Sequence, residues 1–394
     1  MADIDFRAEA EALFAFTRDL RRDFHRHPEL GFQEHRSAGI VAKLLREFGL
    51  QVTEGVGETG VVGVLAGSYP GPTILVRADM DALPIQEEND VPYASEVPGV
   101  MHACGHDAHM AMALTVARLL SAHRDALHGT VKFVFQPAEE GLGGAAKMIA
   151  DGVLEGVDYA LAMHVWNEQP LGWLGIADGP TMAAADMFRI RVLGKGGHAA
   201  HPNVTEDPVL AASSVVTALQ SVVSRHVDPL DAAVVSVASF HAGTAFNIIP
   251  PEAVLEGTIR TFETEVANEV RMRVTRTAHG VAQGLGCRAE VEIVEMNPAV
   301  VNAPAVAQVV REVAAALYPE ATIDPAARTM GAEDMSLMMY DIPGCYFFVG
   351  SANPAKGLDA GHHHPRFNID EDVLPRGTAI MAAAAMALAA NPPA

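Results

Sequence analysis

Short apolar runs, mostly without alternation of polar residues, constrain the fold of this chain more than any other feature. Four of them are rich in Val, Ile, Leu or Phe and are bounded by Gly, Pro or charged residues. They are Thr73–Val76, Val131–Phe135, Tyr159–Val165 and Cys345–Val349. Such runs are typical of strands that helices cover on both faces of a sheet.

Helical patterns accompany these strands. Apolar residues recur at spacings of three and four in residues 7–24 and 36–48, and Ala108 to His123 predicts a helix between two strands. Strand and helix therefore alternate, which indicates an α/β fold with a mixed, mostly parallel sheet sandwiched by helices. We assign residues 1–180 and 295–394 to this domain.

A different pattern begins near residue 180 and predicts an inserted domain. Half-buried strands are indicated at Asp186–Leu193, Val234–Phe240, Val254–Phe262 and Arg288–Glu295. Helical stretches at 207–224 and 264–284 lie between them. Antiparallel strands with helices on one face fit this order, so residues 181–294 are expected to form an α+β domain inserted into the α/β domain.

Length and charge exclude several classes of protein. The 394 residues exceed one ordinary domain, and 27 Lys and Arg against 49 Asp and Glu give a formal charge of −22. That charge repels phosphate backbones and anionic membrane surfaces, so neither nucleic acid nor membrane is an expected partner. Three cysteines are too few for a disulfide framework, no secretory signal is visible, and the apolar run Thr378–Ala390 is too short to span a bilayer. We expect a cytoplasmic protein.

Metal-binding residue types gather in the segment from His102 to His109, which reads HACGHDAH. Cys104 and His106 lie at a predicted loop-to-helix junction, where both can face the cleft at the carboxyl ends of the strands. The strand Val131–Phe135 is then followed by QPAEEGLGGA, with adjacent Glu139 and Glu140. Neighbouring side chains point in different directions, so one glutamate can bind metal while the other serves as general base.

Two further histidine positions complete the pattern. His164 lies at the end of the strand that starts at Tyr159, and His362, His363 and His364 follow the strand Cys345–Val349 by a short loop. Thiolate, imidazole and carboxylate groups from four separate segments thus converge on one edge of the sheet. This set suits two divalent ions, which we expect to be Zn²⁺, Mn²⁺, Co²⁺ or Ni²⁺.

Other polar residues fit roles around such a centre. Asp79, in LVRADMDALP, is either a ligand or a carboxylate that orients a metal-binding imidazole through its other N–H, and we favour the second role. In the inserted domain His198 and Asn247 can polarise a carbonyl oxygen. Arg260 can hold a substrate carboxylate.

Taken together, these motifs resemble the metal-dependent amidohydrolases of the aminoacylase/carboxypeptidase metallopeptidase family. The resemblance runs from about residue 20 to residue 375. It is closest to the branch of hippurate hydrolase, N-acyl-amino-acid amidohydrolases and auxin-conjugate hydrolases. The segments that carry it are RRDFHRHPELGFQE, RADMDALP, GVMHACGHDAHMAMAL, FVFQPAEEGLGGAAKMI, GKGGHAAHP, FNIIPP and GHHHPRFNIDEDVLP.

The resemblance implies a role for each motif residue. It makes Glu139 the general base, Arg260 the clamp for the substrate carboxylate, and Asp79 an orienting carboxylate. It makes residues 1–180 and 295–394 the catalytic, metal-binding domain and the insertion a lid or dimerisation domain. It also implies that the inserted domain of a partner subunit contributes His198, and that Asn247 joins His198 in carbonyl binding. The implied ligands of a binuclear metal centre are Cys104, His106, Glu140, His164 and His363.

The resemblance predicts hydrolysis of a small N-acyl amino acid, with an N-benzoyl or other aryl or acyl group, by a homodimer or homotetramer. The broader family often has a histidine where Arg77 stands, and His362 or His364 could replace His363 as ligand. Three alternatives remain open: a dipeptidase or carboxypeptidase of the same family, a non-catalytic metal-binding protein, and an enzyme with Cys104 as nucleophile.

Overall fold

The computed structural model describes residues 4–393 and divides into two compact units. The first unit takes in the chain up to Gly179, Val301–Arg328 and the segment from Asp334 onward. The second unit is Pro180–Val300 together with Thr329–Glu333. Compared with the expected limits of 181–294, the second unit continues to Val300 and also includes the later segment Thr329–Glu333. The extension arises because the last strand of its sheet runs on to Asn297.

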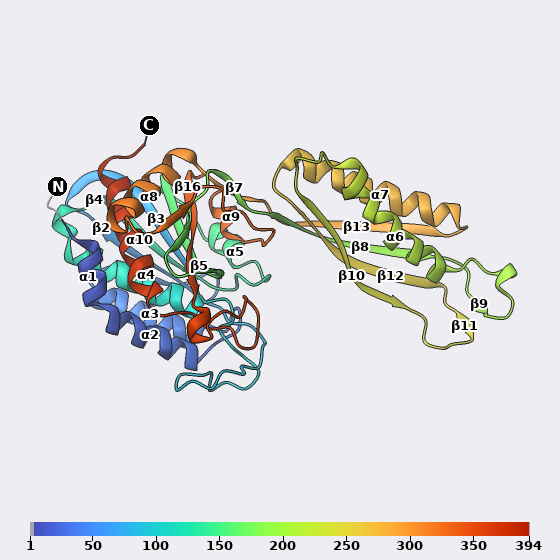
Figure 1. Cartoon of the computed structure of the whole chain (residues 1–394), viewed down its shortest axis with the longest axis horizontal. Helices are drawn as coiled ribbons and strands as arrows, with labels where there is room; N and C mark the ends of the chain where they lie inside the picture. The colour runs from blue at the N-terminus through green and yellow to red at the C-terminus, as the bar shows by residue number, and fades with distance from the viewer. Residues whose placement is uncertain (1–3, 394) are drawn as a thin grey trace. The chain divides into compact units, whose positions relative to one another are not determined.

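An eight-stranded mixed sheet forms the centre of the first unit (Figure 1). Its strands, in spatial order, are β1 (Gln51–Val56), β2 (Gly60–Ala66), β4 (His128–Gln136), β3 (Tyr69–Asp79), β5 (Tyr159–Pro170), β16 (Gly344–Ala352), β6 (Trp173–Gly175) and β15 (Thr322–Asp324). The four central strands β4, β3, β5 and β16 run parallel to one another. They contain the four apolar runs of the sequence, which confirms the predicted buried strands. Their carboxyl ends therefore meet at one edge of the sheet.

Helices cover this sheet, and every residue of β16 is buried. They are α1 (Phe6–Ala12), α2 (Phe14–Arg26), α3 (His35–Glu47), α4 (His106–Ala122), α5 (Gly144–Ala150), α8 (Pro304–Leu317), α9 (Met335–Met338) and α10 (Val373–Ala390), with 3-10 turns η1 (Arg124–Ala126) and η3 (Pro354–Lys356). The single helix predicted at 7–24 is wrong in one respect, because the chain breaks at Leu13 (φ −92°, ψ 4°) into α1 and α2.

Helix α10 packs against α4, α8 and the central strands of the sheet. Among the helices in residues 4–393 it alone is long and apolar enough to cross a membrane, and 72% of that window is buried. Its Ala- and Met-rich sequence therefore belongs to the core of the first unit, as predicted. The mixed α/β fold class is confirmed.

The second unit has a four-stranded antiparallel sheet in the order β10 (Ala233–Ala242), β12 (Glu252–Thr261), β8 (Ala184–Leu193) and β13 (Arg288–Asn297). Along β8, Phe188, Ile190 and Val192 are buried while Met187 and Arg189 are exposed, as the alternation predicted. The buried face packs against α6 (Pro208–His226) and α7 (Thr264–Gly284), which lie side by side on the sheet (Figure 1).

Local signals set the ends of these elements. Helix α6 begins at Pro208 because the Asp207 carboxylate accepts hydrogen bonds from the backbone N–H groups of Val209 and Leu210. A two-stranded sheet pairs β9 (Gly197–His198) with β11 (Ile248–Ile249), and the turn η2 (Pro202–Val204) follows β9. The chain passes between the units at β7 (Gly179–Met182) and β14 (Val300–Asn302).

Candidate metal centre

The predicted metal-binding residues lie at the carboxyl edge of the central sheet. Strand β4 ends at Gln136, three residues before Glu139, and β3 ends at Asp79. Strand β5 carries His164, and the loop that follows β16 carries His362 to His364. Parallel strands present these segments at the same edge, so residues far apart in the sequence reach one site.

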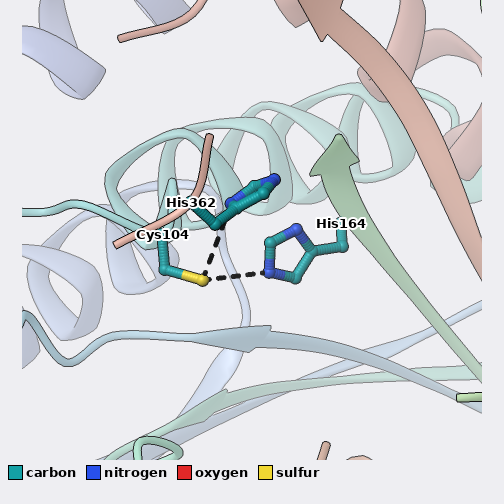
Figure 2. A group of neighbouring side chains, drawn as sticks. All are labelled: Cys104, His164 and His362. Atoms are coloured by element: carbon teal, nitrogen blue, oxygen red, sulfur yellow. Dashed lines mark hydrogen bonds between the residues drawn. The ribbon is translucent and has the colours of Figure 1, made fainter. Parts of the chain in front are cut away.

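The sulfur of Cys104 lies among imidazole rings (Figure 2). Its Sγ atom is 3.4 Å from Nε2 of His164 and 3.8 Å from Nδ1 of His362. Its position depends on Gly105, which has a φ of +94° and would place a Cβ atom 2.4 Å from Val165 Cγ2. Only glycine adopts this close turn without strain, so the turn sets Cys104 and His106 on either side of the start of α4.

Glu140 joins the same group from the loop after β4. Ligand atoms of Cys104, His106 and Glu140 all lie within 4.8 Å of one another. Nε2 of His363 is 3.2 Å from Oε1 of Glu140. His363 has a φ of +63°, a left-handed conformation that costs a non-glycine residue free energy, and its N–H donates to Ala103 O at 2.8 Å. The structure thus brings together the five residues predicted as ligands.

The hydrogen bonds of the rings decide which nitrogens can bind metal. Nδ1 of His106 donates to the carbonyl of Asp81 at 2.8 Å, and Nδ1 of His164 donates to that of Val165 at 2.5 Å. A neutral imidazole has one N–H and one lone pair, so both rings carry their lone pair on Nε2. The buried Nε2 of His106 makes no hydrogen bond to nitrogen or oxygen within residues 4–393. Both lone pairs can therefore bind a cation beside the Cys104 sulfur, which is 3.4 Å from Nε2 of His164.

His109 is a buried histidine of the cluster that our sequence reasoning missed. Its Nδ1 donates to Asp79 Oδ1 at 2.6 Å, and its Nε2 accepts the N–H of Val165 at 3.0 Å. Both nitrogens are therefore occupied, although the ring lies among possible ligands. Its spacing of three from His106 on a helix was the signal that could have found it, because such residues share a face.

Asp79 is held by groups other than the predicted ligands. It accepts hydrogen bonds from His109 and from Arg77, whose Nη1 is 2.6 Å from Oδ2. The Nε2 atom of His106 is 3.7 Å from the same oxygen, and Nδ1 of His106 is oriented by a backbone carbonyl instead. Burial by itself would raise the pKa of Asp79, but His106, His109 and Arg77 outweigh it and hold that pKa well below its ordinary value.

The Arg77 guanidinium, which donates to Asp79, has further partners. It is buried and also donates to Gln136 Oε1 at 2.9 Å and to Asp334 Oδ1 at 3.2 Å. A permanent cation with rigid donors therefore fixes Asp79 and Gln136 at the ends of β3 and β4.

The remaining pKa shifts follow from burial and close neighbours. Burial raises the pKa of the Cys104 thiol against opposing hydrogen bonds from His106 and His363. Hydrogen bonds to Cys104 and Glu140 raise the pKa of His363 to about 10. Burial, with the neighbouring rings of His109 and His363, lowers the pKa of His362 to about 3.

Glu139 and Glu140 belong to different groups of side chains. Carboxylate oxygens of Glu139 and Asp334 lie within 4.8 Å, whereas Glu140 is grouped with Cys104 and His106. The residue before them, Ala138, has a φ of +52°, and its N–H donates to Glu34 Oε1 at 2.9 Å. This strained turn sends the two adjacent carboxylates in separate directions.

The other predicted residues lie in the second unit. His198 is exposed on β9, where its Nδ1 accepts the N–H of Ala200 at 3.1 Å, and it pairs with Ile248, the neighbour of Asn247. Arg260 is on β12, paired with Val234 and Ala185 in the sheet, and its side chain makes no hydrogen bond or ion pair within residues 4–393. His198 and Asn247 lie beyond the Glu252 end of that strand, so they and Arg260 lie at opposite ends of the sheet.

The donor set of the first unit fits a pair of transition-metal ions. One thiolate, one carboxylate and three imidazoles surround the site, and these are the ligand types that Zn²⁺ and its first-row neighbours prefer. Residues 75–387 match a known protein family, described as Peptidase family M20/M25/M40. The chain belongs to this family.

Relatives of the M20 chain share most of its length. An N-acetylcysteine deacetylase of Bacillus subtilis is 42% identical over 90% of this chain and 92% of its own. Thermostable carboxypeptidase 1 of Saccharolobus solfataricus is 41% identical over 91% of each chain. The solved YXEP protein of Bacillus subtilis, described as a dinuclear metal-binding peptidase, is 37% identical with a TM-score of 0.85, over 96% of this chain and 99% of that one.

Membership of M20 makes this chain a metal-dependent enzyme that acts on amide bonds. The cluster around Cys104 brings together residues that could hold its metal, and one solved relative is described as a dinuclear metal-binding peptidase. His109 and Arg77 do not belong to the predicted ligand set; both donate hydrogen bonds to the buried Asp79 carboxylate.

Proposed function

We propose that this M20 enzyme hydrolyses the amide bond of N-acyl amino acids and releases a carboxylic acid and a free amino acid. The observation that carries the proposal is the meeting of Cys104, His106, Glu140, His164 and His363 at one sheet edge. Two divalent ions held there would polarise the amide carbonyl and lower the pKa of an attacking water. The specificity of the reaction then rests on residues around the ions.

We assign the proton transfers to the Glu139 carboxylate. It takes a proton from the attacking water and later gives it to the nitrogen of the leaving amino acid. The position of Glu139 supports this role. Glu139 is next in sequence to Glu140, yet its carboxylate belongs to a different group from the ligand cluster.

His198 and Asn247 are proposed to stabilise the negative charge on the carbonyl oxygen. Because Nδ1 of His198 accepts a backbone N–H, the neutral ring carries its proton on Nε2 and can donate it to a substrate. Asn247 has an amide N–H₂ and lies on the chain that pairs with His198. The two residues form a donor pair on an exposed part of the second unit.

Arg260 is proposed to bind the substrate carboxylate, and its position bears on the oligomeric state. From Glu252 to Arg260 the strand advances eight residues at roughly 3.4 Å each, which separates Arg260 from the His198 end of the sheet by about 27 Å. A dipeptide-sized substrate spans only about 7 Å. If all three residues touch one substrate, a second subunit must supply part of the site, so we propose a homodimer.

The acyl group is proposed to be aryl or short alkyl, such as benzoyl or acetyl. The relative named N-acetylcysteine deacetylase supports this choice, whereas the relative named carboxypeptidase supports cleavage of peptides. We would load the protein with metal and measure free-amine release from N-acetyl and N-benzoyl amino acids and from dipeptides with a free amino group. Faster turnover of the N-acyl compounds supports the proposal, and faster turnover of the dipeptides would reverse it.

A matched pair of variants tests the carboxylate clamp. Arg260→Ala is expected to raise KM for N-benzoylglycine but not for N-benzoylglycinamide, which lacks the carboxylate. Arg189→Ala, on the neighbouring strand β8 and exposed, is the control and leaves both values unchanged. Equal effects of Arg260→Ala on the two substrates would argue against the clamp.

A further inference from the structure

His362 stands beside the predicted ligand His363 but has a different environment. Its side chain is only 11% exposed and lies between the rings of Trp166 and Phe367, with both ring centroids 5.0 Å away. His364, two residues later, is exposed, and its Nδ1 accepts the N–H of Arg366. Packing therefore fixes the His362 ring, and its orientation can be read from its hydrogen bonds.

Asn167 determines which nitrogen of His362 carries the proton. Its backbone N–H donates to Nε2 of His362 at 3.1 Å. Asn167 is itself held, because its side-chain amide donates to Ala360 O at 2.7 Å and Asn368 O at 3.1 Å. Since Nε2 accepts a hydrogen bond, the lone pair is there and the neutral ring carries its proton on Nδ1.

Other arrangements of the ring fit the contacts less well. A flipped ring would turn a carbon atom toward the N–H of Asn167 and leave that buried donor without a partner. A proton on Nε2 would point at the same N–H group. The nearest carboxylate to that nitrogen, Oε2 of Glu168, is 3.6 Å away, which is beyond hydrogen-bond distance.

Nδ1 of His362 faces the sulfur of Cys104 at 3.8 Å, as Figure 2 shows. His164 faces the same sulfur with Nε2, the nitrogen that carries its lone pair. The two rings therefore present opposite chemistry to Cys104. His164 offers a lone pair that a metal ion can share, whereas His362 offers a proton.

We propose that His362 is a positioning residue that donates an N–H···S hydrogen bond to the Cys104 thiolate, and that it does not bind metal. The inference rests on the metal-binding role proposed above for Cys104. A donor at the sulfur withdraws electron density from the metal–thiolate bond and holds the sulfur in place. The two consecutive histidines then have separate roles: His362 donates a hydrogen bond to the sulfur, and His363 binds the metal.

Cobalt substitution detects this hydrogen bond. Co²⁺ bound to a thiolate has a sulfur-to-metal charge-transfer band, and the wavelength of that band depends on the electron density at the sulfur. His362→Phe keeps an aromatic ring between Trp166 and Phe367 but removes the donor. The variant is expected to bind two Co²⁺ ions per subunit at saturation, with affinity lowered about 10-fold. Its band is expected at longer wavelength than in the unsubstituted protein, because the sulfur is more electron-rich.

Two further variants make the result specific. His362→Asn places an amide near the position of Nδ1 and is expected to move the band back toward that of the unsubstituted protein. His364→Phe makes the same chemical change at an exposed neighbour and is expected to leave the band in place. Far-UV circular dichroism of each variant confirms that the fold is retained.

Several outcomes would overturn the proposal. Loss of one Co²⁺ ion per subunit from His362→Phe at saturation would make His362 a ligand. An unchanged charge-transfer band in His362→Phe would show that the ring donates no hydrogen bond to the sulfur. If the band persists in Cys104→Ala, Cys104 is not the thiolate ligand, and the error lies in the proposed metal centre rather than in His362 alone.

Discussion

Nε of Arg21 donates to Oδ2 of Asp107 at 2.8 Å, with both side chains fully buried. Asp107 follows His106 at the start of α4, and Nη2 of the same guanidinium donates to Asn368 at 3.0 Å, four residues after His364. One arginine from α2 thus ties the two segments that carry metal-binding residues. The position of the cluster depends on this link as well as on the sheet.

Arg21→Ala is expected to destabilise the fold strongly, because it removes the permanent cation beside the buried Asp107 carboxylate and leaves only His25 as its close partner. The expected loss in the free energy of unfolding is about 3–5 kcal/mol, measured by urea denaturation. Arg22→Ala is the control, since Arg22 pairs with Glu371 nearer the surface and its loss should cost about 0–1 kcal/mol. Similar losses in the two variants would contradict the role given to Arg21.

Glu139→Gln is expected to keep its metal and its fold while kcat falls by about 10²–10⁴-fold, the size of a general acid–base contribution. Glu140→Gln is the matched comparison, because Glu140 lies with Cys104 and His106 and should lower metal occupancy instead. Steady-state kinetics and elemental analysis separate the two effects. Near-normal turnover of Glu139→Gln would show that another group is the base.

Mixed subunits test whether His198 acts across an interface. Glu139→Gln and His198→Ala chains are each expected to be inactive alone. After random reassociation, half of the dimers contain one chain of each kind, and one of their two sites has both intact residues. About one quarter of wild-type activity should return. If the mixture stays inactive although mixed dimers form, His198 serves its own subunit.

Asp370 is expected to contribute stability that is lost in acid. Its carboxylate accepts from Asn353 Nδ2 at 2.6 Å and Lys356 Nζ at 3.0 Å. Burial would raise its pKa, but these partners outweigh burial and lower it. Because the folded pKa lies below the unfolded value, the contribution is complete above about pH 4 and disappears as pH falls through the folded pKa.

Asp370→Asn should therefore cost about 1.5–3 kcal/mol at pH 7 and progressively less below about pH 4. Urea denaturation at pH 7 and pH 3 measures both differences. A difference that is the same at the two pH values would show that the charge of Asp370 contributes nothing.

The central strands and the metal-binding segments could be predicted because their signals are local. Val131–Phe135 is a buried apolar run, and Cys104-Gly105-His106 combines metal-binding residues with the glycine that the turn needs. The break of the first helix at Leu13 could not be predicted in this way, since neither glycine nor proline marks it.

The separate roles of neighbouring histidines also lay beyond the sequence. His362 and His363 differ through a left-handed backbone at His363 and a hydrogen bond from Asn167, which is distant in the chain. Arg21 is similar, because a polar residue in an amphipathic helix predicts an exposed side chain, whereas the fold buries it against Asp107.

Cys104 and its neighbours are proposed to hold two metal ions needed for amide hydrolysis. The most direct test removes metal with a chelator and then follows free-amine release from an N-acyl amino acid during stepwise return of a divalent ion. Activity should be absent at first and should reach its maximum at two ions per subunit, while Cys104→Ala binds fewer and Cys287→Ala, in the second unit, behaves as wild type. Full activity of the metal-free protein, or unchanged metal binding by Cys104→Ala, would contradict the account.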